Sequence, residues 1–589
     1  MSAPPFTLRV NFSHEDKAAK GLRSLRDPRA APQAPVYFTA REAVEMFPRL
    51  LLFGPRGSGK SVFARQLADE TGAQLVTIHG PDSLSGVMPA ERLLILDGID
   101  RLGPDGEALL NDILAQQGER SLLLLGDGAV VRGWRMPSGI AVHALRPLTV
   151  AERADYLKAH AIVAPAALSD AASNPALFAL ARTVSSPADT PGALIDIWLA
   201  GQPPEAAKAG FDALAAGTSS NRAVDGLLAA RHMRSLAATE VARHFLAAPD
   251  LWGDSLACLL AGDPSLRAPL SALLLAGDED AALKAALLLA GPEEDAAVAG
   301  KFLHLIETGR LSPFDRDRAA RFLALWGDPR DLDALCAVPG GAFTMGSDTH
   351  PNSQPVHRAT VGDFRIGRYP VTNAAYHRFV TATGHQWVSP EAGVAERRNA
   401  PATDLTWRDA RAYCDWLTQV WRTEGRIAAT EYVRLPTEPE WERAARGDQG
   451  DGGDDIVYPW GQGWNPAAAN SEESGLNAQC AVGLFPVGAS PYGCLDMAGQ
   501  VWEWTTTLWG DGMATPSFHY PYADDGREDP EARPAIRRVL RGGCFSSTSL
   551  KACCTYRGSL EPDGFWRGNG FRIVVAKEDP TSRGHKAEC

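Results

Sequence analysis

Arg541-Gly542-Gly543-Cys544-Phe545 opens and Gly570-Phe571-Arg572 closes the stretch SSTSLKACCTYRGSLEPDGFWRGN, which decides how the end of this chain is interpreted. The enclosed residues follow neither the period of an amphipathic helix nor the alternation of a strand, and Pro562-Asp563 is their turn signal. Small, aromatic and arginine side chains in an irregular segment with fixed-looking ends are typical of a binding surface on a rigid scaffold. An ordinary surface loop would have the same composition, so the residues alone leave both interpretations open.

The totals bound the class of protein. A chain of 589 residues is too long for one core and predicts about three or four domains. Hydrophobic content of 45% and charged content of 22% are typical of a folded soluble protein, and a net charge of −13 argues against nucleic-acid binding. We find no secretory signal, no apolar run near the roughly 20 residues of a membrane helix, and no disulfide framework among nine cysteines. We therefore expect a cytoplasmic protein with no membrane contact.

The two ends of the chain read as extensions. Residues 1–35 are rich in proline and carry scattered basic residues, a composition typical of an arm or docking segment. Because the chain has no evident effector domain, we expect an effector partner, and this arm is the candidate for docking it. Residues 578–589 are expected to form a tail.

A nucleotide-binding motif follows the arm. Residues 49–53 read as a buried strand, and they lead into Gly54-Pro55-Arg56-Gly57-Ser58-Gly59-Lys60-Ser61 and then a helical pattern, the required context for a P-loop. Gly54, Gly57 and Gly59 would let backbone N–H groups face phosphates, Lys60 would reach the β- and γ-phosphates, and Ser61 would hold Mg²⁺. We predict binding of ATP or a related nucleotide with Mg²⁺; a decayed, empty loop in a structural scaffold is the alternative.

An acidic strand supports the P-loop. The apolar residues 92–96 end at Asp97, placed to orient Mg²⁺ through water, and Asp100 could polarise the attacking water as a catalytic residue. A further strand is expected at residues 121–125. Strands that alternate with helices predict a parallel α/β sheet with its ligand at the carboxyl ends of the strands.

Three motifs in this predicted domain, residues 36–204, resemble those of a known group of proteins. LLILDGIDRL at 93–102, ALRPL at 144–148 and SNPAL at 173–177 resemble the NACHT/AAA+ P-loop ATPases, in particular the signal-transducing (STAND) kind. The resemblance implies an α/β domain with a small helical lid. Arg101 stands where the group has Glu, and no Ser/Thr-Arg sensor follows the third strand, so nucleotide binding is favoured over efficient hydrolysis.

Residues 205–335 are rich in Ala and Leu and contain a repeated motif. LLAGD at 259–263 and 274–278 and LLAGP at 288–292 each predict a short apolar helix that ends at glycine. Because such helices bury their faces only by stacking, we expect HEAT-like helical repeats. A spacer between the flanking domains is favoured over a partner-binding concave surface.

The chain changes to Trp, Gly and turn residues from about 336 to 577. Six motifs accompany the RGG and GFR ends in order: VPGGAFTMGS at 338–347, FRIGRYPVTN at 364–373, LTWRDA at 405–410, RLPTEPEWE at 434–442, YPWG at 458–461 and DMAGQVWEW at 496–504. This set closely resembles the formylglycine-generating-enzyme family. The resemblance implies an α+β domain with a variant of the C-type lectin fold.

The family's chemistry depends on metals. Its enzymes oxidise a substrate cysteine with copper held by two cysteines, and thiolates suit Cu(I) because both are soft. Ser547 and Ala552 stand at those two positions; Cys553 and Cys554 are adjacent and would point to opposite sides of an extended chain. The iron-dependent relatives need His-x₃-His-x-Glu, which is missing, so we expect neither copper nor iron. A metal-dependent oxidase stays the alternative function, with Cys544 as its remaining candidate thiol.

Calcium binding is left open. The calcium site of the same family uses the Asn of GNVWEW, and this chain has Gln500 at that position.

The same frame with varied residues inside it resembles the variable proteins of diversity-generating retroelements. In those proteins an error-prone reverse transcriptase rewrites codons, and the fold displays the changed side chains on one face. The resemblance implies a ligand-binding surface, diversified or fixed, for a protein ligand. The expected ligand-binding residues, all of which NNC codons can encode, are Phe545, Ser546, Ser547, Ser549, Leu550, Tyr556, Gly558, Ser559, Leu560, Gly564, Phe565, Arg567, Gly568 and Asn569.

Together these observations predict a multidomain protein of signalling or defence. A C-terminal lectin-type domain would recognise a ligand, a helical stalk would carry it, and a STAND-like P-loop module would bind nucleotide.

Overall fold

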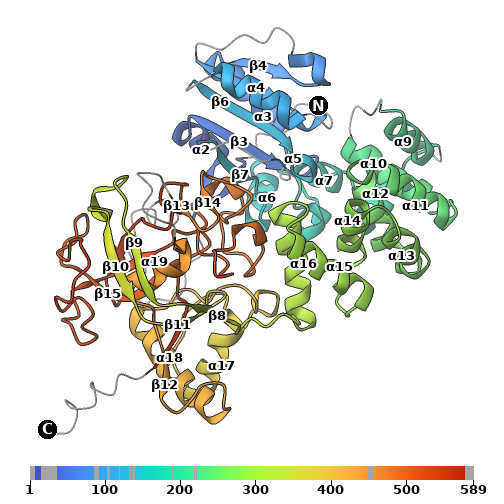
Figure 1. The fold of residues 1–589 in the computed structure, drawn as a ribbon. Coiled ribbons are helices and arrows are strands. Elements are labelled where there is room, and N and C mark those ends of the chain that lie inside the picture. Colours follow the sequence, from blue (N-terminus) through green and yellow to red (C-terminus); the bar gives the residue numbers. More distant parts are fainter. Residues whose placement is uncertain are drawn as a thin grey trace.

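The computed structural model (Figure 1) describes most of the chain. The described residues are 7–14, 17, 36–84, 92–102, 106–117, 120–131, 134, 139–184, 186, 188, 191–203, 205–217, 219, 222–448 and 457–577. The expected tail and most of the expected arm lie outside these ranges.

A parallel sheet forms the centre of the N-terminal domain. Its strands run in the order β4-β5-β6-β3-β7. They are β3 (Arg49–Gly54), β4 (Gln74–Thr77), β5 (Leu93–Asp97), β6 (Ser121–Asp127) and β7 (Ala141–Ala144), with helices α3 (Lys60–Thr71) and α4 (Gly106–Gln117) between them. Alternate residues of β3 enter two apolar clusters, Leu51 and Phe53 on one face and Leu50 and Leu52 on the other. Burial of both faces explains the continuous apolar strands and confirms the expected α/β sheet.

Part of the expected arm belongs to this domain. β1 (Arg9–Ser13) pairs antiparallel with β2 (Tyr37–Thr39), and Val10 forms an isolated bridge with Leu145 beyond β7. Thr39 then caps α2 (Ala40–Met46) in a capping box with Glu42. The N-terminal hairpin is therefore fixed to the edge of the sheet.

A small group of helices follows the sheet. It contains α6 (Val150–Ala159), α7 (Pro175–Ala181) and α8 (Pro191–Ala200). Phe178 and Leu157 share an apolar cluster, and Leu148 N–H donates to Ser173 O at 2.7 Å. These helices occupy the place that the sequence predicts for a lid.

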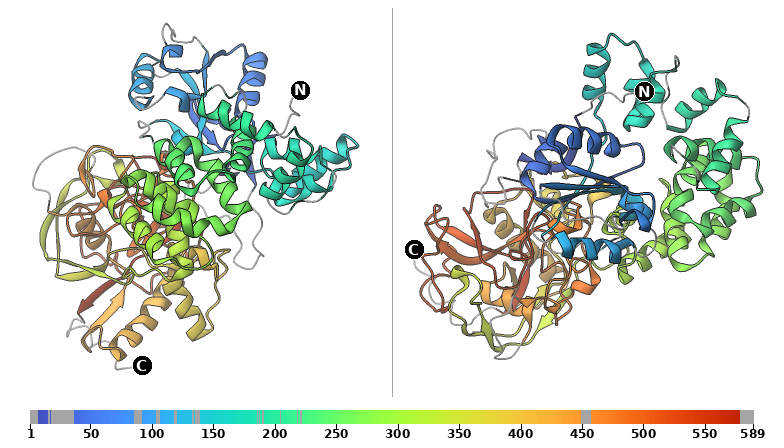
Figure 2. Two further views of the ribbon diagram at one scale, coloured as in Figure 1. Left: turned by 90° about the vertical axis from the view of Figure 1, so that its right-hand side faces the viewer. Right: turned by 90° about the horizontal axis from the view of Figure 1, so that it is seen from above.

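The middle of the chain is helical, as expected, and forms a curved row of helices (Figure 2). The helices are α9 (Ala206–Ala215), α10 (Arg222–Met233), α11 (Ala238–Ala247), α12 (Pro249–Gly262), α13 (Arg267–Leu275), α14 (Glu279–Leu289), α15 (Ala296–Thr308) and α16 (Pro313–Trp326). Helices α12, α13 and α14 end at or just before the three glycine motifs, and their leucines share one core. The HEAT-like class of repeat stays a prediction. Within the described residues, we find no helix with the length and apolarity to cross a membrane.

Helix α16 attaches this row to the C-terminal domain. Asn399 Nδ2 donates to Ala320 O at 2.9 Å, and Arg397 lies 3.4 Å from Asp317 in a buried ion pair. Arg316 donates to the carbonyl of Leu484. Buried polar contacts of this kind fix geometry, because an unpaired partner would be costly.

The C-terminal domain has an α+β fold. One sheet has the order β12-β19-β11-β8 and the other the order β17-β16-β15-β18, and β9–β10 and β13–β14 form two hairpins. Its helices are α17 (Asn373–Thr383), α18 (Trp407–Thr423) and α19 (Glu438–Arg446). Its strands are β8 (Leu335–Val338), β9 (Gly341–Met345), β10 (His357–Val361), β11 (Phe364–Gly367), β12 (Glu431–Arg434), β13 (Val457–Tyr458), β14 (Gly461–Gln462), β15 (Trp502–Gly510), β16 (Arg537–Arg541), β17 (Gly558–Leu560), β18 (Asn569–Gly570) and β19 (Val574–Lys577).

Candidate functional site

The loop between β3 and α3 has the geometry of a phosphate-binding loop. Gly57 and Gly59 have φ angles of 79° and 91°, in the left-handed region that favours glycine. A Cβ on Gly54 would lie 3.0 Å from Ser58 Oγ and 3.2 Å from Leu145 Cβ, so this position has no room for a larger residue without a shift. The loop therefore leads tightly into the N-terminus of α3, where free N–H groups and the helix dipole favour an anion.

Lys60 and Ser61 stand at the start of α3. The Lys60 ammonium donates to Gly54 O at 2.7 Å and to Pro55 O at 3.0 Å, so it spans the loop. Burial lowers the pKa of Lys60, and the negative charge of Asp127 opposes that shift. Ser61 is exposed, so its hydroxyl can reach a Mg²⁺ that accompanies a nucleotide.

The predicted acidic residues lie at the same edge of the sheet. Asp97 ends β5 and is buried, one strand away from β3 across β6. Asp100 follows in a short turn, and its Oδ1 accepts the N–H of Asp127 at 2.9 Å. Asp97 thus lies where a Mg²⁺-orienting carboxylate is expected. The catalytic role of Asp100 stays a prediction, and one of its oxygens already holds the end of β6.

Arg56 is a candidate that the sequence analysis did not single out. Its Nε donates to Asp127 Oδ2 at 2.8 Å, and its Nη2 donates to Asp250 O at 2.9 Å in the first turn of α12. Asn174 Nδ2 donates to the Arg56 carbonyl at 2.8 Å. The P-loop is therefore tied to the sheet, to the helical row and to the lid. In the sequence, the one sign of a role for Arg56 is a charged side chain at an unspecified position of the P-loop motif.

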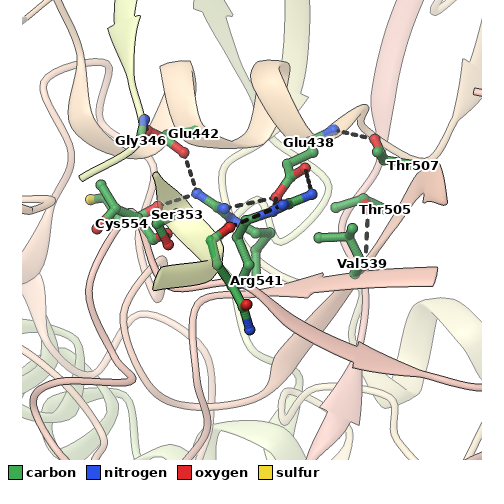
Figure 3. A network of polar contacts seen from close by, with 12 residues as sticks. Gly346, Ser353, Glu438, Glu442, Thr505, Thr507, Val539, Arg541 and Cys554 are labelled. Carbon is green, nitrogen blue, oxygen red and sulfur yellow. Dashed lines mark hydrogen bonds and ion pairs between the residues drawn. The ribbon is translucent and has the colours of Figure 1, made fainter. Parts of the chain in front are cut away.

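Buried ion pairs hold the start and the middle of the framed C-terminal segment. Arg541 lies between Glu438 and Glu442 of α19, and all three side chains are fully buried (Figure 3). Arg557, inside the segment, also pairs with Glu438, at 2.7 Å. One glutamate therefore faces two arginines, and this explains why the RGG motif needs the glutamate-rich helix that precedes it.

The end of the segment is held in the same way. Arg572 Nε lies 2.6 Å from Glu503 Oε2 on β15, and Glu503 also accepts the indole N–H of Trp441 at 2.6 Å. Arg572 Nη2 donates to Leu495 O at 3.0 Å. The GFR end is therefore fixed from within the domain, and both ends of the segment are rigid.

Most of the segment between these anchors is buried. Phe545 and Leu560 belong to the same apolar core as Trp502 and Trp504. A side chain in that core cannot contact an external ligand in this conformation, so much of the irregular pattern reflects packing. The buried members of the expected ligand-binding set are Phe545, Ser546, Ser547, Gly558, Ser559, Leu560, Gly564, Phe565, Gly568 and Asn569.

The other members of that set form an accessible rim: Ser549, Leu550, Tyr556 and Arg567. Leu550 is 41% exposed and is the most accessible member of this rim. The ring of Tyr556 lies 4.7 Å from the ring of His350, and burial and the nearby charge of Lys551 lower the pKa of that histidine. Tyr556 and Lys551 therefore both lie near His350.

The residues at the family's copper positions do not supply thiolates. Ser547 Oγ accepts the N–H of Cys544 at 3.0 Å, and Ala552 is buried. Cys553 donates to Leu550 O at 3.2 Å, whereas Cys554 packs in a separate apolar cluster. A hydroxyl and a methyl group are poor ligands for Cu(I), so these residues do not fit the group.

The Gln500 amide, at the position of the family's calcium-binding Asn, has internal partners. Its Oε1 accepts from Asn470 Nδ2 at 2.8 Å and from Cys480 N at 3.1 Å, and its Nε2 donates to Cys480 O at 3.0 Å. Gln500 therefore ties two loops together directly, with its oxygen engaged by two N–H groups.

The rim reaches the P-loop domain through residues 472–477, which we call the bridging loop. Arg567 Nη2 donates to Asn477 O at 3.3 Å, and Asn477 in turn donates to the carbonyl of Asn11 on β1. Asn11 Nδ2 donates back to Gly475 O at 2.8 Å. The bridging loop therefore contacts the framed C-terminal segment on one side and the N-terminal domain on the other.

The same loop packs against the strand that carries the P-loop. A Cβ on Gly475 would lie 2.7 Å from Val142 and 3.1 Å from Phe53, the residue before Gly54. Asn11 Oδ1 accepts the N–H of Ala144 at 2.9 Å, beside the same strand. The two candidate sites are thus joined by direct contacts.

Two family models match this chain. Residues 324–577 match the sulfatase-modifying factor enzyme 1-like domain, and residues 50–125 match the ATPase family associated with various cellular activities (AAA), which implies nucleotide binding with Mg²⁺. The formylglycine-generating enzyme of Mycobacterium tuberculosis is 35% identical over a region that covers 43% of this chain and 99% of that protein. The chain therefore belongs, through its C-terminal domain, to the formylglycine-generating enzyme family.

Other relatives differ in what they are described as doing. The inactive C-alpha-formylglycine-generating enzyme 2 of Mus musculus is 30% identical over 42% of this chain and 87% of its own length. Among solved structures, Treponema denticola variable protein 1 matches with a TM-score of 0.30 and 19% identity, over 41% of this chain and 94% of that chain.

Proposed function

We propose that this chain is a ligand-recognition protein in which the C-terminal domain binds a protein ligand and the P-loop domain binds ATP with Mg²⁺. The observation that carries this proposal is the accessible rim of Ser549, Leu550, Tyr556 and Arg567 on a segment whose ends are held by buried ion pairs. Rigid supports under an exposed leucine and partly accessible tyrosine and arginine side chains are what a protein-binding surface requires. A STAND-like role in signalling or defence, an effector partner and a cytoplasmic location belong to the same proposal.

The P-loop supports the nucleotide half of this proposal. A bound nucleotide would supply a polyphosphate and a Mg²⁺ at the start of α3, where Lys60 would neutralise charge and Ser61 would face the metal. Arg56 connects that loop to α12, so a change at the phosphates has a direct route to the helical row. Binding, rather than rapid hydrolysis, is the function we assign to this site.

The bridging loop supports coupling between the two halves. It contacts Arg567 of the rim and Asn11 of the P-loop domain, through hydrogen bonds that each contribute about 1 kcal/mol. We infer that ligand binding at the rim and nucleotide binding at the P-loop influence each other. A coupling of this kind is reciprocal in the two affinities.

Hydrogen–deuterium exchange of the full chain tests the coupling. We expect ATP with Mg²⁺ to change deuterium uptake in residues 472–477 of the wild type, and Asn11→Ala to abolish that change while leaving ATP bound. Asn352→Ala removes a comparable side-chain hydrogen bond, to Ala514 O at 2.9 Å, away from the bridging loop, and serves as the control. The same uptake with and without nucleotide in the wild type would exclude coupling through this loop.

Binding to an array of purified proteins from the source organism tests recognition. We expect the wild type to bind discrete proteins, and Leu550→Asp with Tyr556→Ala to lose them. Val487→Asp changes another exposed hydrophobic residue, 53% accessible, and should leave binding intact. If the rim variant retained every interaction, the recognition surface would lie elsewhere.

Sequencing of the DNA that flanks the gene tests diversification separately. A near-copy of the final coding segment, differing at adenines and adjacent to a reverse-transcriptase gene, is expected for a diversified rim. We expect the differences to concentrate in the codons of the four rim residues. Without such a copy, the rim is a fixed recognition surface.

A further inference from the structure

Two thiols of the C-terminal domain lie close together. Cys336, on β8, packs against the apolar cluster that contains Cys494. The Cys336 sulfur lies 4.0 Å from the position that a Cβ would take on Gly493, the neighbour of Cys494. Cys494 is fully buried, whereas Cys336 is half-buried and has access to solvent.

The pair has a positive electrostatic environment. The hydrogen bond with Cys494 lowers the pKa of Cys336 to about 7, and the charges of Arg572 and Arg368 act in the same direction. The same hydrogen bond, together with burial, raises the pKa of Cys494. At pH 7, about half of the Cys336 thiol is therefore ionised, next to a protonated Cys494 thiol.

Cys258 is a natural comparison within the same chain. Of the described cysteines, only Cys258 and Cys336 are half-buried and the rest are buried. Burial raises the pKa of Cys258 to about 11, and the negative charges of Asp254 and Asp196 add to the shift. The two cysteines therefore have similar exposure, and their neighbouring groups cause the difference between their pKa values.

We propose that Cys336 and Cys494 form a peroxide-responsive thiol pair, a site of reversible modification in the recognition domain. A half-buried thiolate beside a second thiol is the arrangement in which oxidation proceeds to a disulfide. Strand β8, which carries Cys336, is the first strand after α16 along the chain. This modification site is independent of the function proposed for the rim.

The chemistry balances with hydrogen peroxide as the oxidant. The Cys336 thiolate attacks one peroxide oxygen and breaks the O–O bond, which gives a sulfenic acid and hydroxide. The Cys494 thiol then attacks the Cys336 sulfur, the S–S bond forms, the S–O bond breaks, and the second oxygen leaves as water with the thiol proton. The two sulfur atoms lose two electrons in total, and one peroxide becomes one water and one hydroxide, which takes up the proton that Cys336 released on ionising to give the second water.

Peptide mapping of the full chain after treatment with hydrogen peroxide tests the proposal. We expect a linked pair of peptides containing Cys336 and Cys494, with a mass loss of about 2 Da that dithiothreitol reverses. Cys494→Ser should leave Cys336 as a sulfenic acid that dimedone traps, and Cys336→Ser should leave Cys494 unmodified. A wild type in which Cys336 stays reduced, or pairs with another cysteine, would overturn the proposal.

Alkylation rates give a second measurement that does not depend on the substitutions. At pH 7 we expect iodoacetamide to modify Cys336 at least ~10-fold faster than Cys258, because only the thiolate reacts. The Cys336 rate should reach half of its plateau near pH 7, while the Cys258 rate should still rise at pH 9. Equal rates, or identical pH profiles, would show that Cys336 is an ordinary thiol.

Discussion

The two candidate sites differ in where their chemistry resides. In the P-loop, the binding geometry depends on the backbone. Gly57 and Gly59 take left-handed conformations, and the Lys60 side chain bonds to backbone carbonyls of the loop. In the framed C-terminal segment the chemistry resides in side chains, and most of them point into the core. A motif that fixes backbone geometry is recognisable from the order of its residues. A surface is recognisable only when burial is known.

The largest expected effect comes from the ion pairs that frame the C-terminal segment. Glu438→Gln keeps the shape of the side chain and removes the charge that faces Arg541 and Arg557. Because Arg557 would lose its buried carboxylate partner and Arg541 would lose one of its two, we expect the free energy of unfolding of this domain to fall by about 3–5 kcal/mol. Urea unfolding followed by tryptophan fluorescence measures it.

An exposed pair in the same segment is the control. Arg408 and Asp563 lie 2.8 Å apart at the surface, with about half or more of each side chain accessible. Asp563→Asn should change stability by less than ~0.5 kcal/mol, since exposed pairs contribute little. If the two variants were equally stable, the frame would not depend on its buried charges.

A pH-dependent effect is expected next, at Asp496 beside the same frame. Burial raises the pKa of Asp496 to about 6, and its carboxylate accepts the N–H of Gly483 at 2.7 Å. The folded state then holds a proton that the unfolded chain loses near pH 4, so this contribution to stability is present below pH 4 and is lost as the pH rises through 6. Two pKa units correspond to roughly 3 kcal/mol.

The substitution Asp496→Asn should remove that pH dependence. We expect the Asp496→Asn variant and the wild type to have similar stability at pH 4, and the variant to be more stable at pH 7.

The substitution Asp328→Asn should instead make the protein less stable than the wild type at pH 7, because the pKa of Asp328 is lowered. Burial would raise this pKa, but the hydrogen bond and charge of Arg330 outweigh burial. A pH profile with the same slope for all three proteins would contradict the assignment.

An effect of similar size in binding is expected at the P-loop. Lys60→Ala removes the ammonium that spans the loop, and charged hydrogen bonds of this kind contribute about 1.5–3 kcal/mol. We therefore expect roughly 100-fold weaker binding of a fluorescent ATP analogue, with no change in the unfolding of the C-terminal domain. Lys208→Ala, at an exposed lysine of α9, should bind as the wild type does. Unchanged affinity in Lys60→Ala would mean that the loop does not bind phosphates.

The sequence predicted the parallel sheet, the helical middle and the lectin-type fold, because strand periodicity, glycine-terminated helices and ordered motifs are local signals. It could not predict the contacts that join the parts. Arg56, Asn11 and Asn477 acquire partners from 71 to 466 positions away only by folding, and no local pattern marks them. For the same reason, the irregular segment gave no indication that Phe545 and Leu560 would enter the core.

The smallest expected effect on stability is that of a substitution at the rim, compared with one in the buried part of the same segment. Leu550→Ser replaces a leucine that is 41% exposed, so we expect stability to change by less than ~0.5 kcal/mol. Leu560→Ser, ten positions further along, replaces a leucine that is 1% exposed and should cost about 2–5 kcal/mol through the cavity and the buried hydroxyl. NNC codons can encode both residues, and the sequence places both in the expected ligand-binding set. Thermal unfolding of the pair therefore separates a recognition rim from a core that merely looks variable, and equal destabilisation by both substitutions would place Leu550 in the core as well.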